Sequence, residues 1–386
     1  MRHRRRLLLT LLLVAGAVLA GLAISAALRD TTAPQVYVET TGRLAADAPW
    51  ELFASADEPV TFRLAYGDVT LEEIAQDTTF VVPAAEGKVV ASLSATDGAG
   101  NVTEHEFVVF GVPRPHLELS AAERLRSGDP LGVRMRVVQA GDEPELLAQV
   151  GGVTLTLDGD AVPTLATADG GKALLAAPLA VEPRTLRVEA TVTDEFGRTT
   201  TSGVDVVVDP LPVTVEQLAI DAATLAVITP EGRELEARAW ASAWADVAPD
   251  PRWWGTFVAP IEGVATSGFG DARRYAPGGP VSFHNGLDLA APTGTPVHAT
   301  NVGRVVVAGA YPIKGGWVAI DHGGGLMSMY FHMSQVLVEV GDEVARGAVI
   351  GEVGSTGLST GPHLHWEMRV GEVPTSPMVW VDKVLP

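Results

Sequence analysis

Two motifs decide how the C-terminal part of this chain folds: HNGLD at His284–Asp288 and HLH at His363–His365. Six of the nine histidines lie between His284 and His365. In a β-strand, alternate side chains leave the same face about 6 to 7 Å apart, so His363 and His365 would be neighbours. The Asn-Gly pair between His284 and Asp288 favours a strand end that turns back. Both motifs can therefore direct side chains at one metal ion, with one imidazole of HLH left to face a substrate.

The metal ligands available here are imidazoles and carboxylates, because the sequence contains no cysteine. A catalytic zinc ion takes three protein ligands and leaves a fourth position for water, whose pKa falls toward about 7. Two histidines and one carboxylate satisfy this rule. HLH alone is weak evidence, but here it occurs with HNGLD, with glycine-rich flanks and with His332 in YFHMS. Together these motifs predict a zinc hydrolase site.

The region from about residue 255 to residue 386 resembles the M23 metallopeptidases, the lysostaphin and LytM type of peptidoglycan endopeptidase. The resemblance covers roughly a third of the chain. It rests on TSGFG (266–270), HNGLDLAAPTGTPV (284–297), DHGGG (321–325), YFHMS (330–334) and GLSTGPHLHWE (357–367).

The resemblance implies a small antiparallel β-sheet domain with zinc at the floor of an open groove. Its zinc ligands would be His284, Asp288 and His365. His332 and His363 would form the catalytic pair, which orients and deprotonates the water and helps to protonate the departing amine. The substrate would be a peptide cross-link of bacterial peptidoglycan. Some relatives have lost their ligands and only activate other hydrolases, whereas this sequence keeps all of these positions.

Two further histidines of this region are expected to lie outside the site. His298 is in a strand-like run and is interpreted as structural, and His322 in Asp-His-Gly would support a turn or an outer hydrogen bond. The loop at residues 271–283 departs from the family pattern and would border the groove. Substrate choice is therefore left open by the sequence.

The N-terminus is expected to direct the chain out of the cytoplasm. MRHRRR is followed by an uncharged run from Leu7 to Leu28, about the 20 residues that a helix needs to cross a bilayer. The arginines would stay cytoplasmic, which places the rest of the chain outside. A cleaved signal peptide is the alternative, with small residues at Ser25–Ala27. We expect a single-pass protein of the bacterial cytoplasmic membrane with an extracytoplasmic catalytic domain, or a secreted protein if the segment is cleaved.

Residues 33–112 and 114–210 show short alternating strands separated by turns, which predicts two antiparallel β-sandwiches. Asp97-Gly-Ala-Gly-Asn101 and Asp194-Glu-Phe-Gly-Arg198 occupy equivalent places, so the blocks look like copies of one domain. The size and the turn loosely resemble bacterial Ig-like domains. The turn aspartates could contribute to a calcium site, but tight turns require the same residues. Such domains would serve as spacers or bind a regulatory protein.

Residues 211–254 are predicted to form a helical connector. Thr229-Pro230 is typical of a helix start, and Leu235, Ala239, Trp240, Ala243, Trp244 and Val247 approximate one apolar face. The tryptophans of this region could stack on sugar rings, but a helix that docks two tryptophans on a neighbouring domain is the more common arrangement.

Composition excludes several other functions. A net charge of −20 without an internal basic cluster argues against nucleic acid as a partner. No paired acid and nucleophile carboxylates of a glycosidase are recognisable. Residues 340–353 resemble the hairpin of biotinyl carrier domains but lack the lysine that such a carrier needs. A non-catalytic envelope scaffold, which binds peptidoglycan or activates a partner hydrolase, remains the alternative.

The expected architecture is mostly β. It consists of a basic stub with a transmembrane anchor or signal (1–30), two Ig-like β-sandwiches (33–112 and 114–210), a helical connector (211–254) and a zinc endopeptidase domain (255–386). The zinc ion would activate water to cut peptidoglycan peptides.

Overall fold

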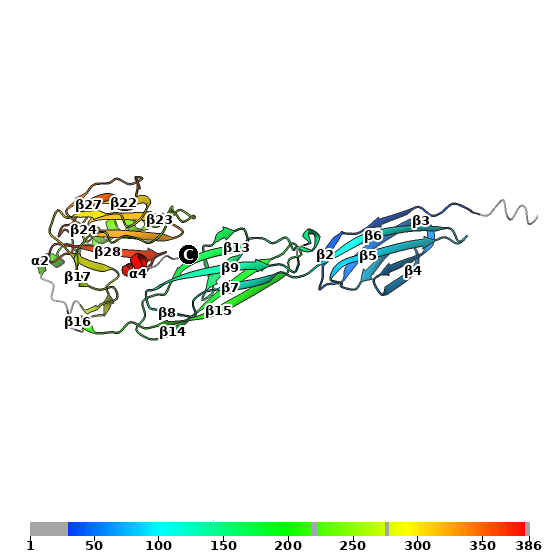
Figure 1. The fold of residues 1–386 in the computed structure, drawn as a ribbon, viewed down its shortest axis with the longest axis horizontal. Coiled ribbons are helices and arrows are strands. Elements are labelled where there is room, and N and C mark those ends of the chain that lie inside the picture. The colour runs from blue at the N-terminus through cyan, green and yellow to red at the C-terminus, as the bar shows by residue number, and fades with distance from the viewer. Residues whose placement is uncertain (1–29, 142, 218–221, 275–277, 383–386) are drawn as a thin grey trace, which may run out of the picture. The chain divides into compact units, whose positions relative to one another are not determined.

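A computed structural model describes residues 30–141, 143–217, 222–274 and 278–382 (Figure 1). β-Strands dominate these ranges, as the sequence predicts. The predicted membrane segment Leu7–Leu28 lies outside them. Within the described ranges, no helix is both long and apolar enough to cross a membrane. The chain divides into two compact units, of which the first holds residues 1–115 with 139–149 and 194–198, and the second holds the rest.

The first unit contains a six-stranded sheet in the order β1-β3-β5-β6-β2, with β4 on the other side of β3. Its core strand β3 alternates buried and exposed residues along most of its length, as a half-buried strand should. A bulge between Ser55 and Val60 lets β3 pair first with β1 and then with β5. The strands are β1 (Val36–Glu39), β2 (Arg43–Ala45), β3 (Trp50–Tyr66), β4 (Val69–Val82), β5 (Gly87–Thr96) and β6 (Val102–Val112).

The first unit therefore differs in two respects from the predicted antiparallel sandwich. One hydrogen-bonded sheet joins its strands, because β3 spans 17 residues and serves both halves. In addition, β2 pairs with β6 in parallel. Sequence periodicity located pieces of these strands but not the continuity of β3 through its bulge.

The next block belongs to the second unit and consists of two sheets that share one apolar core. One sheet has the order β11-β10-β14-β15-β8, and the other has the order β12-β13-β9-β7. The strands are β7 (His116–Ser120), β8 (Arg124–Arg126), β9 (Pro130–Val138), β10 (Thr154–Leu157), β11 (Asp160–Val162), β12 (Leu165–Thr167), β13 (Gly170–Ala176), β14 (Arg184–Thr193) and β15 (Thr199–Asp209). The short helix η1 (Pro144–Leu146) follows β9 in the sequence but belongs to the first unit. Two sheets are present as a sandwich requires, but β15 pairs with β8 in parallel, which the predicted antiparallel sandwich did not include. The Ig-like assignment stays a prediction.

The two equivalent turns have the same local structure. The Asp97 carboxylate accepts hydrogen bonds from the backbone N–H groups of Ala99 and Asn101, both at 2.8 Å. The Asp194 carboxylate accepts from the N–H groups two and four residues ahead, both at 3.0 Å. These carboxylates are thus used to close the turns, which favours the turn interpretation over calcium binding.

The connector includes β16 (Val215–Gln217), α2 (Ala222–Leu225) and α3 (Pro230–Trp244). Helix α3 begins as predicted, because the Thr229 hydroxyl accepts a hydrogen bond from Gly232 N–H at 3.0 Å. Ala243 is buried, and Trp240 and Trp244 pack with it against one face of the C-terminal domain. The tryptophans therefore dock the helix. Leu235, however, is 47% exposed, so the predicted apolar face was wrong at this position.

The C-terminal domain is built on an eight-stranded sheet, β17-β20-β28-β24-β23-β22-β26, with β29 beside β28. Every residue of β23 is buried, which marks it as a central strand. Two small sheets, β21-β27-β25 and β16-β18-β19, complete the domain. The elements are β17 (Val264–Ser267), β18 (Ala272–Arg274), β19 (Ser282–Phe283), β20 (Leu287–Ala290), β21 (Pro296–His298), β22 (Gly303–Tyr311), β23 (Gly315–Gly323), β24 (Leu326–Met333), β25 (Gln335–Val336), β26 (Glu343–Val344), β27 (Val349–Glu352), β28 (His363–Val370), β29 (Val373–Thr375) and α4 (Pro377–Asp382).

Candidate metal centre and active site

The two motifs that the sequence analysis singled out meet on neighbouring strands. β20 and β28 are antiparallel, and their register places Asp288 opposite His365 and Ala290 opposite His363. Residues directly opposite each other in an antiparallel pair direct their side chains to the same face. His284 lies just before β20, where its backbone N–H donates to the Asp271 carbonyl at 2.9 Å. The strand pairing thus brings together residues that are far apart in the sequence.

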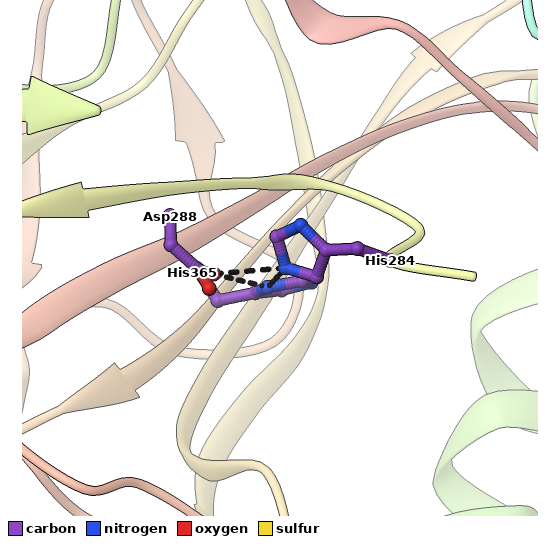
Figure 2. Close-up of side chains that lie close together, drawn as sticks. All are labelled: His284, Asp288 and His365. Carbon is purple, nitrogen blue, oxygen red and sulfur yellow. Dashed lines mark hydrogen bonds and ion pairs between the residues drawn. The ribbon is translucent and has the colours of Figure 1, made fainter. Parts of the chain in front are cut away.

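Three side-chain atoms converge at this place (Figure 2). His284 Nε2 lies 3.0 Å from Asp288 Oδ1, and His365 Nδ1 lies 2.8 Å from the same oxygen. The two ring nitrogens are 2.9 Å apart. All three side chains are largely buried, with exposed fractions of 6% for His284, 13% for Asp288 and 12% for His365.

The outer nitrogens of both rings are held by acceptors. His284 Nδ1–H donates to the Gly268 carbonyl at 2.8 Å, and His365 Nε2–H donates to Glu367 Oε1 at 3.0 Å. In neutral rings this leaves lone pairs on the two inner nitrogens, which face each other and a carboxylate oxygen. Such lone pairs repel one another unless a metal ion or a proton lies among them. The donor set, two imidazoles and one carboxylate with fixed outer hydrogen bonds, therefore fits a zinc ion.

Charged groups reinforce this arrangement. Burial raises the pKa of Asp288, but the adjacent His284 and His365 lower it by more, so that it stays far below its usual range. Glu367 is buried and ion-paired with Arg369, whose Nε lies 2.6 Å from Glu367 Oε2. Arg369 and His365 keep the pKa of Glu367 well below its usual range against the effect of burial. Both carboxylates are therefore anionic near neutral pH.

His332 and His363 face each other beside the three converging atoms. Their ring centroids are 4.8 Å apart, and His363 Nε2 lies 3.9 Å from Asp288 Oδ1. His332 Nδ1–H donates to the Thr356 carbonyl, and His363 Nδ1–H donates to the Gly361 carbonyl, both at 2.8 Å. Each ring therefore has its Nε2 available to accept a proton. Burial, assisted by the nearby His365 and His363, lowers the pKa of His332 to about 3, so this ring is neutral at pH 7.

The five residues line one cleft of about 770 Å³. The predicted loop at 271–283 does border it, because Arg273 lines the cleft and places its Nη2 3.4 Å from Asp288 Oδ2. Other lining residues come from separate elements: Glu216, Thr266, Ser267, Ala290, Ile313, Lys314, Phe331, Leu358, Ser359, Thr360, Gly361, Pro362 and Glu367.

Sequence reasoning placed two histidines outside the site, and neither of them is among the residues that line the cleft. His298 Nδ1–H donates to the Gly347 carbonyl at 2.9 Å. His322 is fully buried and bonds to the Val302 carbonyl and to Ser328 Oγ, both at 2.8 Å. Sequence reasoning missed Glu367, although the two-residue period of a strand puts it on the same face as His363 and His365.

An antiparallel β domain that gathers two imidazoles, one carboxylate and a facing pair of imidazoles in a cleft has the composition of a metallopeptidase centre. Residues 282–377 match the model of peptidase family M23. This region of the chain is a peptidase family M23 domain.

Curated relatives share this region. The chain is 41% identical over 113 residues to the peptidoglycan DD-endopeptidase ShyB of Vibrio cholerae. The matched segment covers 29% of this chain and 26% of that relative. The chain is 45% identical over 96 residues to the DD-carboxypeptidase/endopeptidase Mpg of Neisseria meningitidis, covering 25% and 22%. The matches thus span about a quarter of the length of these relatives.

A solved structure with a related sequence is the catalytic domain of the antimicrobial peptidase lysostaphin from Staphylococcus simulans. It is 33% identical and covers 31% of this chain and 93% of that domain, with a TM-score of 0.29.

Proposed function

We propose that this chain is a zinc-dependent endopeptidase that hydrolyses peptide cross-links of bacterial peptidoglycan. The observation that carries the proposal is the convergence of His284 Nε2, Asp288 Oδ1 and His365 Nδ1 within 3.0 Å of one another, with both outer ring nitrogens already engaged. Relatives named as peptidoglycan DD-endopeptidases support the substrate and favour a D,D cross-link as the bond that is cut.

In this proposal, His284, Asp288 and His365 hold the metal, and His332 and His363 are the catalytic residues. A zinc ion bound by these residues would lower the pKa of water and polarise a peptide carbonyl. The Nε2 atoms of His332 and His363 are in a position to accept the proton of the attacking water, because their Nδ1 atoms are engaged by carbonyls. After protonation, the same atoms can donate a hydrogen bond to the developing oxyanion or pass a proton to the departing amine.

The remaining parts of the proposal concern the rest of the chain. The apolar run at residues 7–28 would anchor the protein in the cytoplasmic membrane or export it after cleavage. The two β blocks would be Ig-like spacers or would bind a regulatory protein. The alternative is a non-catalytic envelope scaffold, which an intact set of ligands alone does not exclude.

The test is digestion of purified peptidoglycan by the full chain, with products analysed by mass spectrometry. We expect chelator-sensitive release of peptides that a His363→Ala variant does not release. The masses identify the bond that is cut. A zinc-loaded chain that binds peptidoglycan without releasing products would support the scaffold instead.

A further inference from the structure

Helix α3 carries a buried carboxylate that the metal centre does not use. Glu236 is 7% exposed and lies on the face of α3 that packs on the C-terminal domain. Its Oε1 accepts hydrogen bonds from the backbone N–H groups of Ile313 at 2.6 Å and Lys314 at 2.8 Å. A buried carboxylate is costly unless it is hydrogen-bonded, and a bond between a charged acceptor and an N–H group is among the stronger kinds. This contact therefore fixes the turn between β22 and β23.

The turn at Ile313 and Lys314 also contacts the two segments that carry His332 and His363. The Lys314 carbonyl accepts the backbone N–H of His332 at 2.9 Å. The Ile313 carbonyl accepts the N–H of Leu358 at 2.7 Å, in the loop that leads to His363. Both turn residues also line the cleft.

The packing around this turn leaves little room for adjustment. His332 has a φ of 64°, a left-handed conformation that is uncommon for a residue with a side chain. A Cβ added to Gly357 would lie 2.3 Å from the Ile313 carbonyl oxygen. His332 thus keeps its conformation through backbone contacts with the turn, and the loop before His363 can approach the turn this closely only with glycine at 357.

We infer that Glu236 is a positioning residue for the two catalytic histidines, and that helix α3 thereby supports the geometry of the active site. Helix α3 lies before residues 282–377, so this role belongs to the connector and not to the segment that matches the family model. The inference rests on the proposed function, because it assigns His332 and His363 a part in hydrolysis. Loss of the carboxylate releases the turn, and misplacement of a catalytic group by about 1 Å can lower a rate about 100-fold.

The experiment compares Glu236→Ala, Glu236→Gln and the matched control Glu234→Ala in the full chain. Glu234 lies on the same helix, is exposed and pairs with Arg238. For Glu236→Ala we expect kcat to fall about 10- to 100-fold, with KM and zinc affinity within about threefold of wild type. Glu236→Gln keeps an acceptor oxygen and should recover most of the activity. It therefore tests the role of the acceptor even if Glu236→Ala does not fold.

Hydrogen exchange measured by mass spectrometry gives a readout that does not need activity. In Glu236→Ala, exchange should quicken at residues 313–316 and 356–359, and it should not change in Glu234→Ala. Unchanged kcat in Glu236→Ala, or a parallel loss of kcat and zinc affinity, overturns the inference. If the wild-type chain hydrolyses nothing, the proposed function fails. If hydrogen exchange at residues 313–316 and 356–359 is also unchanged in Glu236→Ala, the positioning role fails as well.

Discussion

Glu367 binds the outer nitrogen of His365 and so leaves Nδ1 to face the candidate metal centre. It accepts a hydrogen bond from His365 Nε2–H at 3.0 Å and is itself held by Arg369. A carboxylate behind a ligating imidazole fixes the tautomer and raises the basicity of the ligand. The orientation of His365 therefore depends on a residue that the motif HLH does not include.

Replacing Glu367 with alanine should weaken zinc binding about 10- to 100-fold, because His365 then lacks the partner that fixes its Nδ1 as the ligand. Competition with a chromophoric chelator measures the affinity directly. Glu372→Gln, at an exposed position close by, serves as the control and should bind zinc as wild type does. Equal affinities in wild type and Glu367→Ala would contradict this role.

His322 should make the stability of the C-terminal domain depend on pH. Burial lowers its pKa to about 4 in the folded chain, against about 6.5 in an unfolded one. The unfolded chain therefore binds more protons between these values, so the stability present above pH 6.5 is lost as the pH falls toward 4. The loss amounts to about 1.4 kcal/mol per pH unit.

The measurement is urea unfolding at pH 7, 6 and 5, followed by tryptophan fluorescence. Seven of the eight tryptophans lie between residues 240 and 380, so the signal reports mainly on the C-terminal domain and α3. A His322→Gln variant should show a smaller decrease with pH than wild type. The same slope in both chains would assign the pH dependence to other groups.

The start of helix α3 was predictable from sequence, whereas its buried face was only partly so. Thr229 and Pro230 carry a local signal that depends on no distant contact. The buried face was inferred by assuming that apolar residues face inward. That assumption failed at Leu235 and overlooked Glu236, because the partners of the carboxylate are N–H groups from a turn 77 and 78 residues away.

The cap of α3 should contribute measurably to stability. Thr229→Ala removes the acceptor for Gly232 N–H and should cost about 1 kcal/mol, because a helix N-terminus then loses one of its few satisfied donors. Thermal unfolding compares this variant with Thr229→Ser, which keeps the hydroxyl and should stay close to wild type. If the two variants lost the same stability, the hydrogen bond would not be the cause.

The site residues could be named from the sequence, but their geometry could not be derived from it. The two-residue spacing of His363 and His365 correctly indicated one face of a strand. The pairing of Asp288 with His365 depends on the register of β20 and β28, which local periodicity does not contain. The motifs were linked by their joint occurrence in one region and by the resemblance to a family, and the roles of the five residues stay predictions.

The organisation of the complete chain was predictable to a lesser degree. Alternating strands indicated a mostly β protein, and that prediction is confirmed. The continuity of β3 through a bulge and the parallel pairs β2–β6 and β8–β15 were missed, because they depend on contacts between distant residues. The N-terminal segment lies outside the described residues, so its role as anchor or signal stays a prediction.

Zinc should stabilise one unit of the chain and not the other. The converging atoms His284 Nε2, Asp288 Oδ1 and His365 Nδ1 belong to the second unit. When an ion binds only the folded form, a free ion concentration of about 1,000 times its Kd adds about 4 kcal/mol to the free energy of unfolding. Calorimetry with zinc and with chelator should therefore shift the unfolding of the second unit alone. A His284→Ala chain that shows the same shift would place the ion elsewhere.

The left-handed backbone of His332 has a consequence for how such proteins diverge. Glycine and asparagine adopt a φ of 64° more readily than most residues, so replacing His332 by either would relieve backbone strain of roughly 1 kcal/mol while removing an imidazole from the cleft. Selection for folding alone would accept that replacement, whereas selection for the proposed hydrolysis would retain the histidine. In a lineage without that selection, drift at this position would yield a well-folded descendant that lacks one of the two facing imidazoles.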